Sequence, residues 1–126
     1  MMSITGRATP KITEIPDADR PLSEQWRIAA HQWVDAEAAA QLLEDLKTTS
    51  LEQFKQQLIE AEGDMPDSHA ERRVKSRPQW EQYIRDMVAA RKEANLCKVK
   101  LDWLRMRFSE WQSRDANSRA EMRLTR

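Results

Sequence analysis

The longest uninterrupted stretch of this sequence runs from Pro78 to Leu124 and contains no glycine or proline after its first residue. Proline suits the first turn of an α-helix, and neither of the usual helix breakers follows it. Charged residues make up 33% of the chain, and Ala, Leu, Glu, Arg and Gln are abundant, which is typical of long helices. The stretch therefore predicts one long helix over 78–124, with which the rest of the chain has to pack.

Apolar residues recur at steps of three and four along this predicted helix, which places them on one face. An earlier segment, about residues 21–62, carries a matching stripe. Two long amphipathic helices of this kind predict an antiparallel pair. The stripe of the long helix consists of Trp80, Tyr83, Ile84, Met87, Ala90, Ala94, Cys97, Leu101, Leu104, Phe108 and Trp111, and that of the first helix of Trp26, Ala29, Ala30, Trp33, Ala36, Ala40, Leu43, Leu51, Phe54, Leu58 and Ala61.

The first helix is expected to begin near Pro21 and to end at Gly63, because glycine is the commonest residue after a helix C-terminus. We favour a continuous helix over about 21–62. The alternative is a kink or break near residue 49, because Lys47 interrupts the apolar stripe and the sequence 50–53 (SLEQ) fits a capping box.

A short helix is expected at the bend, over about residues 68–76. The sequence 68–71 (SHAE) fits a second capping box, and Arg77–Pro78 disfavours continuation of that helix. Residues 1–20 contain two prolines and show no helical period, so we expect a flexible N-terminal arm.

These elements predict an all-α fold: a long antiparallel helical hairpin with a short helix at the bend, in a single domain over 21–126. The charge distribution agrees with pairing of the two halves. Residues 1–63 carry six basic and eleven acidic side chains, whereas residues 64–126 carry fifteen basic and ten acidic ones. Opposite net charges on the two helices favour their association within one chain.

A second apolar line follows the long helix on nearly the opposite side from the first. A lone pair of helices buries one such line and leaves the other in water. We therefore expect a homo-oligomer, in which hairpins assemble into a helical bundle or coiled coil. The predicted oligomer seam consists of Val88, Leu96, Val99, Trp103 and Met106, with Leu42 and Leu46 on the first helix.

The sequence offers little for catalysis, and we expect neither an enzyme nor a metal or other cofactor. Neither His31 nor His69 is preceded at three residues by a glutamate, as a di-iron bundle site would require. Glycines occur only at 6 and 63, so a glycine-rich phosphate loop is excluded. A single cysteine, no apolar run of membrane-spanning length and no signal-peptide pattern together predict a cytoplasmic protein.

Binding of nucleic acid, in particular single-stranded DNA, is the alternative to a protein partner. Cations that hold phosphates, interleaved with aromatic side chains on which bases stack, suit a single strand. Both tryptophans of that line also fit the packing seams, and acidic neighbours dilute its charge. The candidate DNA-binding line is Lys100, Trp103, Arg107, Trp111 and Arg114, with a second basic cluster at Arg72, Arg73 and Lys75.

The run DMPDSHAERRVKSRPQW, followed by DMVAARKEANLCKVKLDWLRMRFSEWQSRDANSRAEMRL, resembles small helical proteins of temperate phages and prophages that are encoded near early recombination and replication genes. The resemblance covers roughly residues 22–124 and carries no catalytic motif. It implies a non-catalytic accessory protein in the cytosol of a bacterial host, which acts on a partner in DNA metabolism or host defence.

Overall fold

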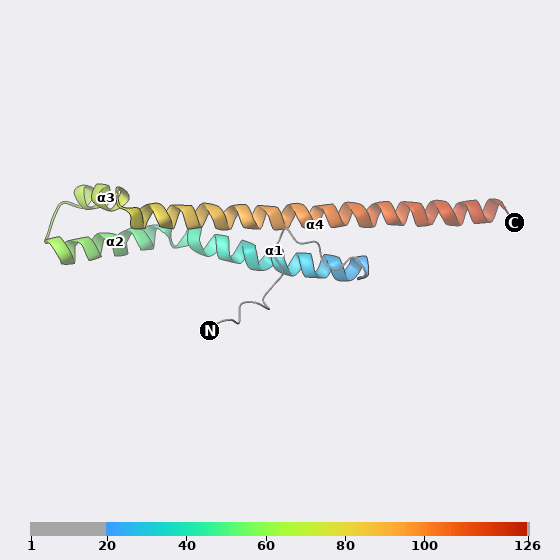
Figure 1. Cartoon of the computed structure of the whole chain (residues 1–126), viewed down its shortest axis with the longest axis horizontal. Helices are drawn as coiled ribbons and strands as arrows, with labels where there is room; N and C mark the ends of the chain where they lie inside the picture. Colours follow the sequence, from blue (N-terminus) through green and yellow to red (C-terminus); the bar gives the residue numbers. More distant parts are fainter. Residues whose placement is uncertain (1–19, 126) are drawn as a thin grey trace. The chain divides into compact units, whose positions relative to one another are not determined.

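The computed structural model describes residues 20–125, which form four α-helices and no strand (Figure 1). These are α1 (Leu22–Asp45), α2 (Lys47–Glu62), α3 (Asp67–Lys75) and α4 (Pro78–Leu124). The predicted all-α fold is confirmed. The predicted N-terminal arm, apart from Arg20, lies outside the described residues.

The helix ends that depend on glycine and proline lie where the sequence predicts them. Helix α4 begins at Pro78 and ends at Leu124. Helix α2 ends before Gly63, whose φ of 95° is in the region that favours glycine, and whose N–H donates to the carbonyl of Ile59. The short helix α3 follows, displaced by one residue from its predicted ends.

The expectation of one continuous helix over 21–62 is wrong. The alternative, a break, is present, but three residues before the predicted position near residue 49. The interruption lies at Leu46, where φ is −86° and ψ is 1°. One turn earlier, the carbonyl of Leu43 accepts a hydrogen bond from the hydroxyl of Tyr83 in α4. A side chain that occupies a helix carbonyl in this way is a recognised cause of a local kink.

Neither predicted capping box is formed. Helix α2 follows Leu46 without a side-chain cap, so Ser50 lies inside the helix rather than at its start. Helix α3 likewise has no side-chain cap and begins after Pro66, with Asp67 in its first turn. Proline fixes φ near the value needed there, and a carboxylate near the N-terminus interacts favourably with the helix dipole.

The chain divides into two compact units. In the terminal unit (Met1–Asp35 with Asn95–Arg126), the start of α1 packs antiparallel to α4 around Ala29, Leu101 and Leu104, each 1% exposed. Trp33 lies at the edge of this core, with the Lys98 ammonium 5.0 Å from its ring centre. The main apolar stripe of α4 is therefore the face that this unit buries.

In the bend unit (Ala36–Ala94), α2 and α3 pack against the first turns of α4 (Figure 1). The buried residues of its core are Leu58, Ala70, Val74 and Trp80. The Trp80 ring meets Phe54 edge to face and stacks on Tyr83, with centroid distances of 6.2 and 5.6 Å. The two buried residues of α3, Ala70 and Val74, have short side chains, and through them this nine-residue helix packs against α2.

Candidate interaction surface

The face of α4 that turns away from Leu101 and Leu104 carries large apolar side chains at the surface. Its residues follow one another at steps of three, four and three, so they share one side of the helix. We call Leu96, Val99, Trp103 and Met106 the exposed seam; their exposed fractions are 42%, 64%, 40% and 60%. An apolar line of this length on a surface is typical of an interface rather than of scattered exposed residues.

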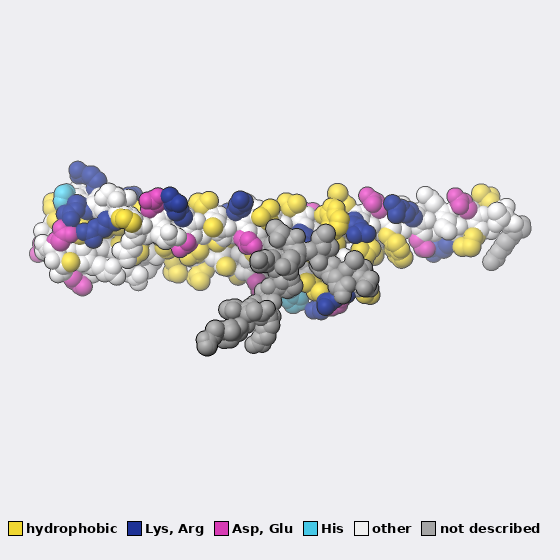
Figure 2. Space-filling model, in the orientation of Figure 1, with side chains coloured by type: hydrophobic (Ala, Val, Ile, Leu, Met, Phe, Trp, Pro, Cys, Tyr) yellow, Lys and Arg dark blue, Asp and Glu magenta, His cyan; other side chains and the backbone are white. Residues whose placement is uncertain are grey.

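The other residues of the predicted oligomer seam lie in the bend unit and are also at the surface. Val88 is exposed on α4, and Leu42 and Leu46 are exposed at the end of α1 and at the break. Figure 2 shows apolar side chains along the surface of α4, interrupted by charged ones. The assembly of these residues with another chain stays a prediction.

The predicted DNA-binding line of α4 is divided in the structure. The Arg107 guanidinium lies over the Trp103 ring, 5.1 Å from its centre, as a cation–π pair. Trp111 instead stacks on Phe108, with ring centroids 6.0 Å apart, and borders a shallow apolar hollow beside Leu22. Trp111 thus continues the main stripe, at 53% exposure, beyond the point where α1 begins.

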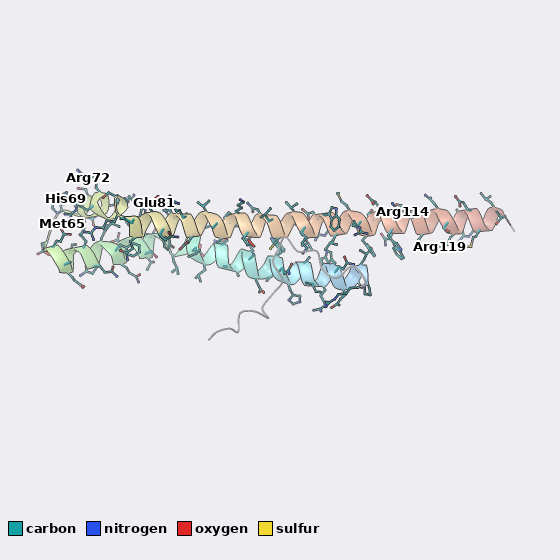
Figure 3. All side chains as sticks on the ribbon, viewed as in Figure 1. Met65, His69, Arg72, Glu81, Arg114 and Arg119 are labelled. Carbon is teal, nitrogen blue, oxygen red and sulfur yellow. The ribbon has the colours of Figure 1, made fainter. Side chains whose placement is uncertain are left out.

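The remaining cations of that line differ in accessibility. Lys100 is half-buried, whereas Arg114 is exposed near the C-terminal end of α4 (Figure 3). Within residues 20–125, Arg114 has no carboxylate partner. Two of the acidic residues that the sequence places nearby form ion pairs: Asp102 lies 3.3 Å from Lys98, and Asp115 lies 2.9 Å from Arg119.

The second predicted basic cluster, on α3, is mostly engaged in ion pairs. Arg73 bonds to Glu62 at 2.6 Å, and Arg77 bonds to the same carboxylate at 2.7 Å. The hydrogen bonds from Arg73 and then Arg77 hold the pKa of Glu62 below its ordinary value. Lys75 lies 3.6 Å from Glu71, so among the three predicted residues only Arg72 has no ion pair within the described chain (Figure 3).

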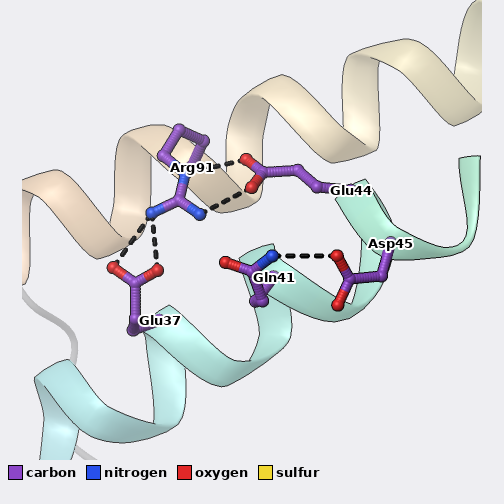
Figure 4. A network of polar contacts seen from close by, with 5 residues as sticks. All are labelled: Glu37, Gln41, Glu44, Asp45 and Arg91. Atoms are coloured by element: carbon purple, nitrogen blue, oxygen red, sulfur yellow. Dashed lines mark hydrogen bonds and ion pairs between the residues drawn. The ribbon is translucent and has the colours of Figure 1, made fainter.

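One polar site that the sequence reasoning missed joins α1 to α4 inside the bend unit. Arg91 of α4 donates hydrogen bonds from Nε and Nη2 to the two carboxylate oxygens of Glu44 and from Nη1 to both oxygens of Glu37, at 2.7 to 2.9 Å (Figure 4). These bonds, above all those that Arg91 donates to Glu44, raise the pKa of Arg91, and the same contact lowers the pKa of Glu44. Glu37 and Glu44 are seven residues apart, hence on one face, and that spacing is the signal that could have revealed them.

A second site that the sequence reasoning missed is Lys55, a residue that is only 4% exposed. It bonds to Asp67 of α3 at 2.7 Å and to Glu52 at 2.9 Å. These hydrogen bonds, that to Asp67 first, raise its pKa. The pair with Asp67 joins α2 to the start of α3 and fixes the two helices across the turn.

No helix within residues 20–125 combines the length and the apolar composition that a membrane crossing requires. The same residues contain no group of three or more His, Cys, Asp or Glu side chains placed to hold a metal ion. No protein-family model, no curated protein and no solved structure matches the chain.

Proposed function

We propose that this protein is a non-catalytic interaction protein that binds another protein chain through the exposed seam of α4. The observation that carries the proposal is the position of four large apolar side chains on the side of α4 that its own core does not use. Leu101 and Leu104, on the other side, are 1% exposed, whereas Val99 and Met106 are 64% and 60% exposed.

Burial of this seam would remove apolar surface from water, which is the main driving force of protein association. A helix that offers apolar anchors at steps of three and four binds most readily to another helix or to a groove. Trp103 is the largest of these anchors, and tryptophan is enriched among the residues that dominate binding energy. The resemblance to temperate-phage proteins supports a partner in phage DNA metabolism or host defence, in a bacterial cytosol.

The experiment compares wild-type protein with Met106→Glu and Met122→Glu. These two methionines lie on the same helix and are almost equally exposed, at 60% and 57%, but only Met106 belongs to the seam. A carboxylate in the seam should abolish the binding of another chain, whether this is self-association in light scattering or a partner protein recovered with the purified chain. Met122→Glu should leave that binding unchanged. Equal effects of the two substitutions, or none from either, would contradict the proposal.

Single-stranded DNA binding is the second candidate, and the Arg107–Trp103 pair favours it. With the guanidinium over the indole ring, the pair offers one group for a phosphate and one for a base. The test is an anisotropy titration of labelled single- and double-stranded DNA at low and moderate salt. Binding that weakens steeply with salt and is lost in Arg107→Glu with Arg114→Glu would establish this function. An absence of DNA binding at low salt would eliminate this second candidate function.

A further inference from the structure

The charged residues at the two ends of the exposed seam indicate which kind of partner binds there. In the heptad pattern of a coiled coil, Leu96 and Trp103 occupy a positions, and Val99 and Met106 occupy d positions. The next d position towards the N-terminus is Lys92, and the next a position towards the C-terminus is Glu110. Both are exposed, and neither has an ion pair within residues 20–125. The four apolar residues thus lie between a cation and an anion on one continuous helix.

Resting on the proposed function, we propose that the occupant of the seam is a second copy of this chain, whose α4 packs antiparallel about a two-fold axis. In this arrangement Val99 faces Trp103, Leu96 faces Met106, and Lys92 faces Glu110 of the other copy. The two-fold axis repeats each pair, so the seam is closed by four apolar layers with an opposite-charge pair at each end.

Side-chain volume favours this register. Each layer combines residues of complementary size, because the bulky Trp103 faces the small Val99, and the two intermediate residues, Leu96 and Met106, face each other. A parallel dimer in register would place Trp103 against Trp103 and Val99 against Val99, so one layer would be crowded and another underfilled. An antiparallel shift by one heptad towards the C-terminus would place Val99 against Glu110 and leave only the Trp103–Met106 layers apolar. The opposite shift would place the charged Lys92 against Trp103.

Charge favours the same register. A parallel pair would place Lys92 against Lys92 and Glu110 against Glu110, both of them like-charged, in positions that face the partner. In the antiparallel pair, each Lys92 instead faces a Glu110 of the other copy, which is an attractive contact. This register also places Glu93 near Arg107 of the other copy, at the edge of the interface. The like-charged residues near the axis are Lys100 and Asp102, and Asp102 already lies near Lys98 and Arg105 of its own chain. The balance of the facing charges is therefore attractive.

The first test exchanges the two end charges. Lys92→Glu or Glu110→Lys alone creates two like-charged pairs per dimer and should weaken dimerisation roughly ten-fold at low salt. The double variant restores opposite charges and should return the dissociation constant to within about three-fold of the wild type. Sedimentation equilibrium over a wide concentration range measures these constants, and circular dichroism verifies that every variant stays helical.

The second test locates the two copies by disulfide formation in a Cys97→Ala background. A mixture of Lys92→Cys and Glu110→Cys proteins should form the mixed cross-link. Either protein alone should form little, because 18 residues of helix separate identical positions by about 27 Å. Cross-linking of each variant with itself would establish a parallel pair and overturn the antiparallel register, as would failure of the double charge exchange to restore binding.

Failure of this inference and failure of the proposed function are distinguishable. The chain could be monomeric at every concentration and still bind a protein partner, with binding abolished by Met106→Glu but not by Met122→Glu. That result would overturn the second copy as the occupant of the seam and keep the proposed function. A monomer that retains no partner would overturn both.

Discussion

The division of α4 into a buried and an exposed side can be tested by truncating two residues that lie two positions apart. Leu101 is 1% exposed in the core of the terminal unit, whereas Val99 is 64% exposed in the seam. Leu101→Ala should lower the free energy of unfolding by about 2–4 kcal/mol, since it removes apolar contacts and leaves a cavity beside Ala29 and Leu104. Val99→Ala should change it by no more than about 0.5 kcal/mol, because little surface is buried there and alanine is the better helix former.

Urea unfolding followed by circular dichroism measures both variants. With a slope of about 2 kcal/mol per molar urea, Leu101→Ala should lower the transition midpoint by about 1–2 M. The measurements are made first on dilute protein, because any association through the seam adds stability that rises with concentration. If Val99→Ala were as destabilising as Leu101→Ala in dilute protein, the assignment of the two faces would be refuted. A Val99→Ala effect that emerges only in concentrated protein would instead reflect association.

Three further substitutions test contacts of the bend unit. Because the pKa of Glu44 is below its ordinary value of 4.5, the Arg91–Glu44 contact stabilises the fold above that pH and is lost as pH falls through the lowered value. Arg91→Met should therefore be less stable at neutral pH and lose less stability on acidification, as thermal melts across acidic pH will measure. Gly63→Ala should lower the free energy of unfolding, measured in urea, by about 1–2 kcal/mol. An added Cβ meets no atom within 4 Å, so only the φ of 95° opposes it. An unchanged stability would contradict the claim that this φ requires glycine. Tyr83→Phe should cost about 0.5–1.5 kcal/mol, by the same measurement, through loss of the bond to Leu43, and an unchanged midpoint would show that bond to be unimportant.

Local signals in the sequence determined the ends and faces of the helices. Pro78 and Gly63 act through their own backbone geometry, so their effects do not depend on distant residues. The three- and four-residue spacing likewise identified Ala94, Cys97 and Leu101 as buried, because any helix with that stripe turns it towards its partner. The same spacing identified the exposed seam, although its occupant is still a proposal.

Tertiary contacts decided what the spacing could not. The sequence near Ser50 has the residues of a capping box, yet the interruption lies at Leu46, beside the carbonyl that Tyr83 reaches from forty residues away. Lys55 looks like a surface cation in sequence, but a carboxylate on α3 allows its burial.

The candidate DNA-binding line divides for the same reason. Its members share one line in the sequence, but the start of α1 at Leu22 leaves Trp111 to stack on Phe108 beside a hollow, while Trp103 pairs with Arg107. The ion pairs of Arg91 join it to Glu44, which is 47 positions away in the sequence, and to Glu37, which is 54 positions away. Helical periodicity determines which side of a helix a residue lies on, because it is fixed by the backbone. It does not determine which distant group lies opposite, because the pairing of helices sets that register.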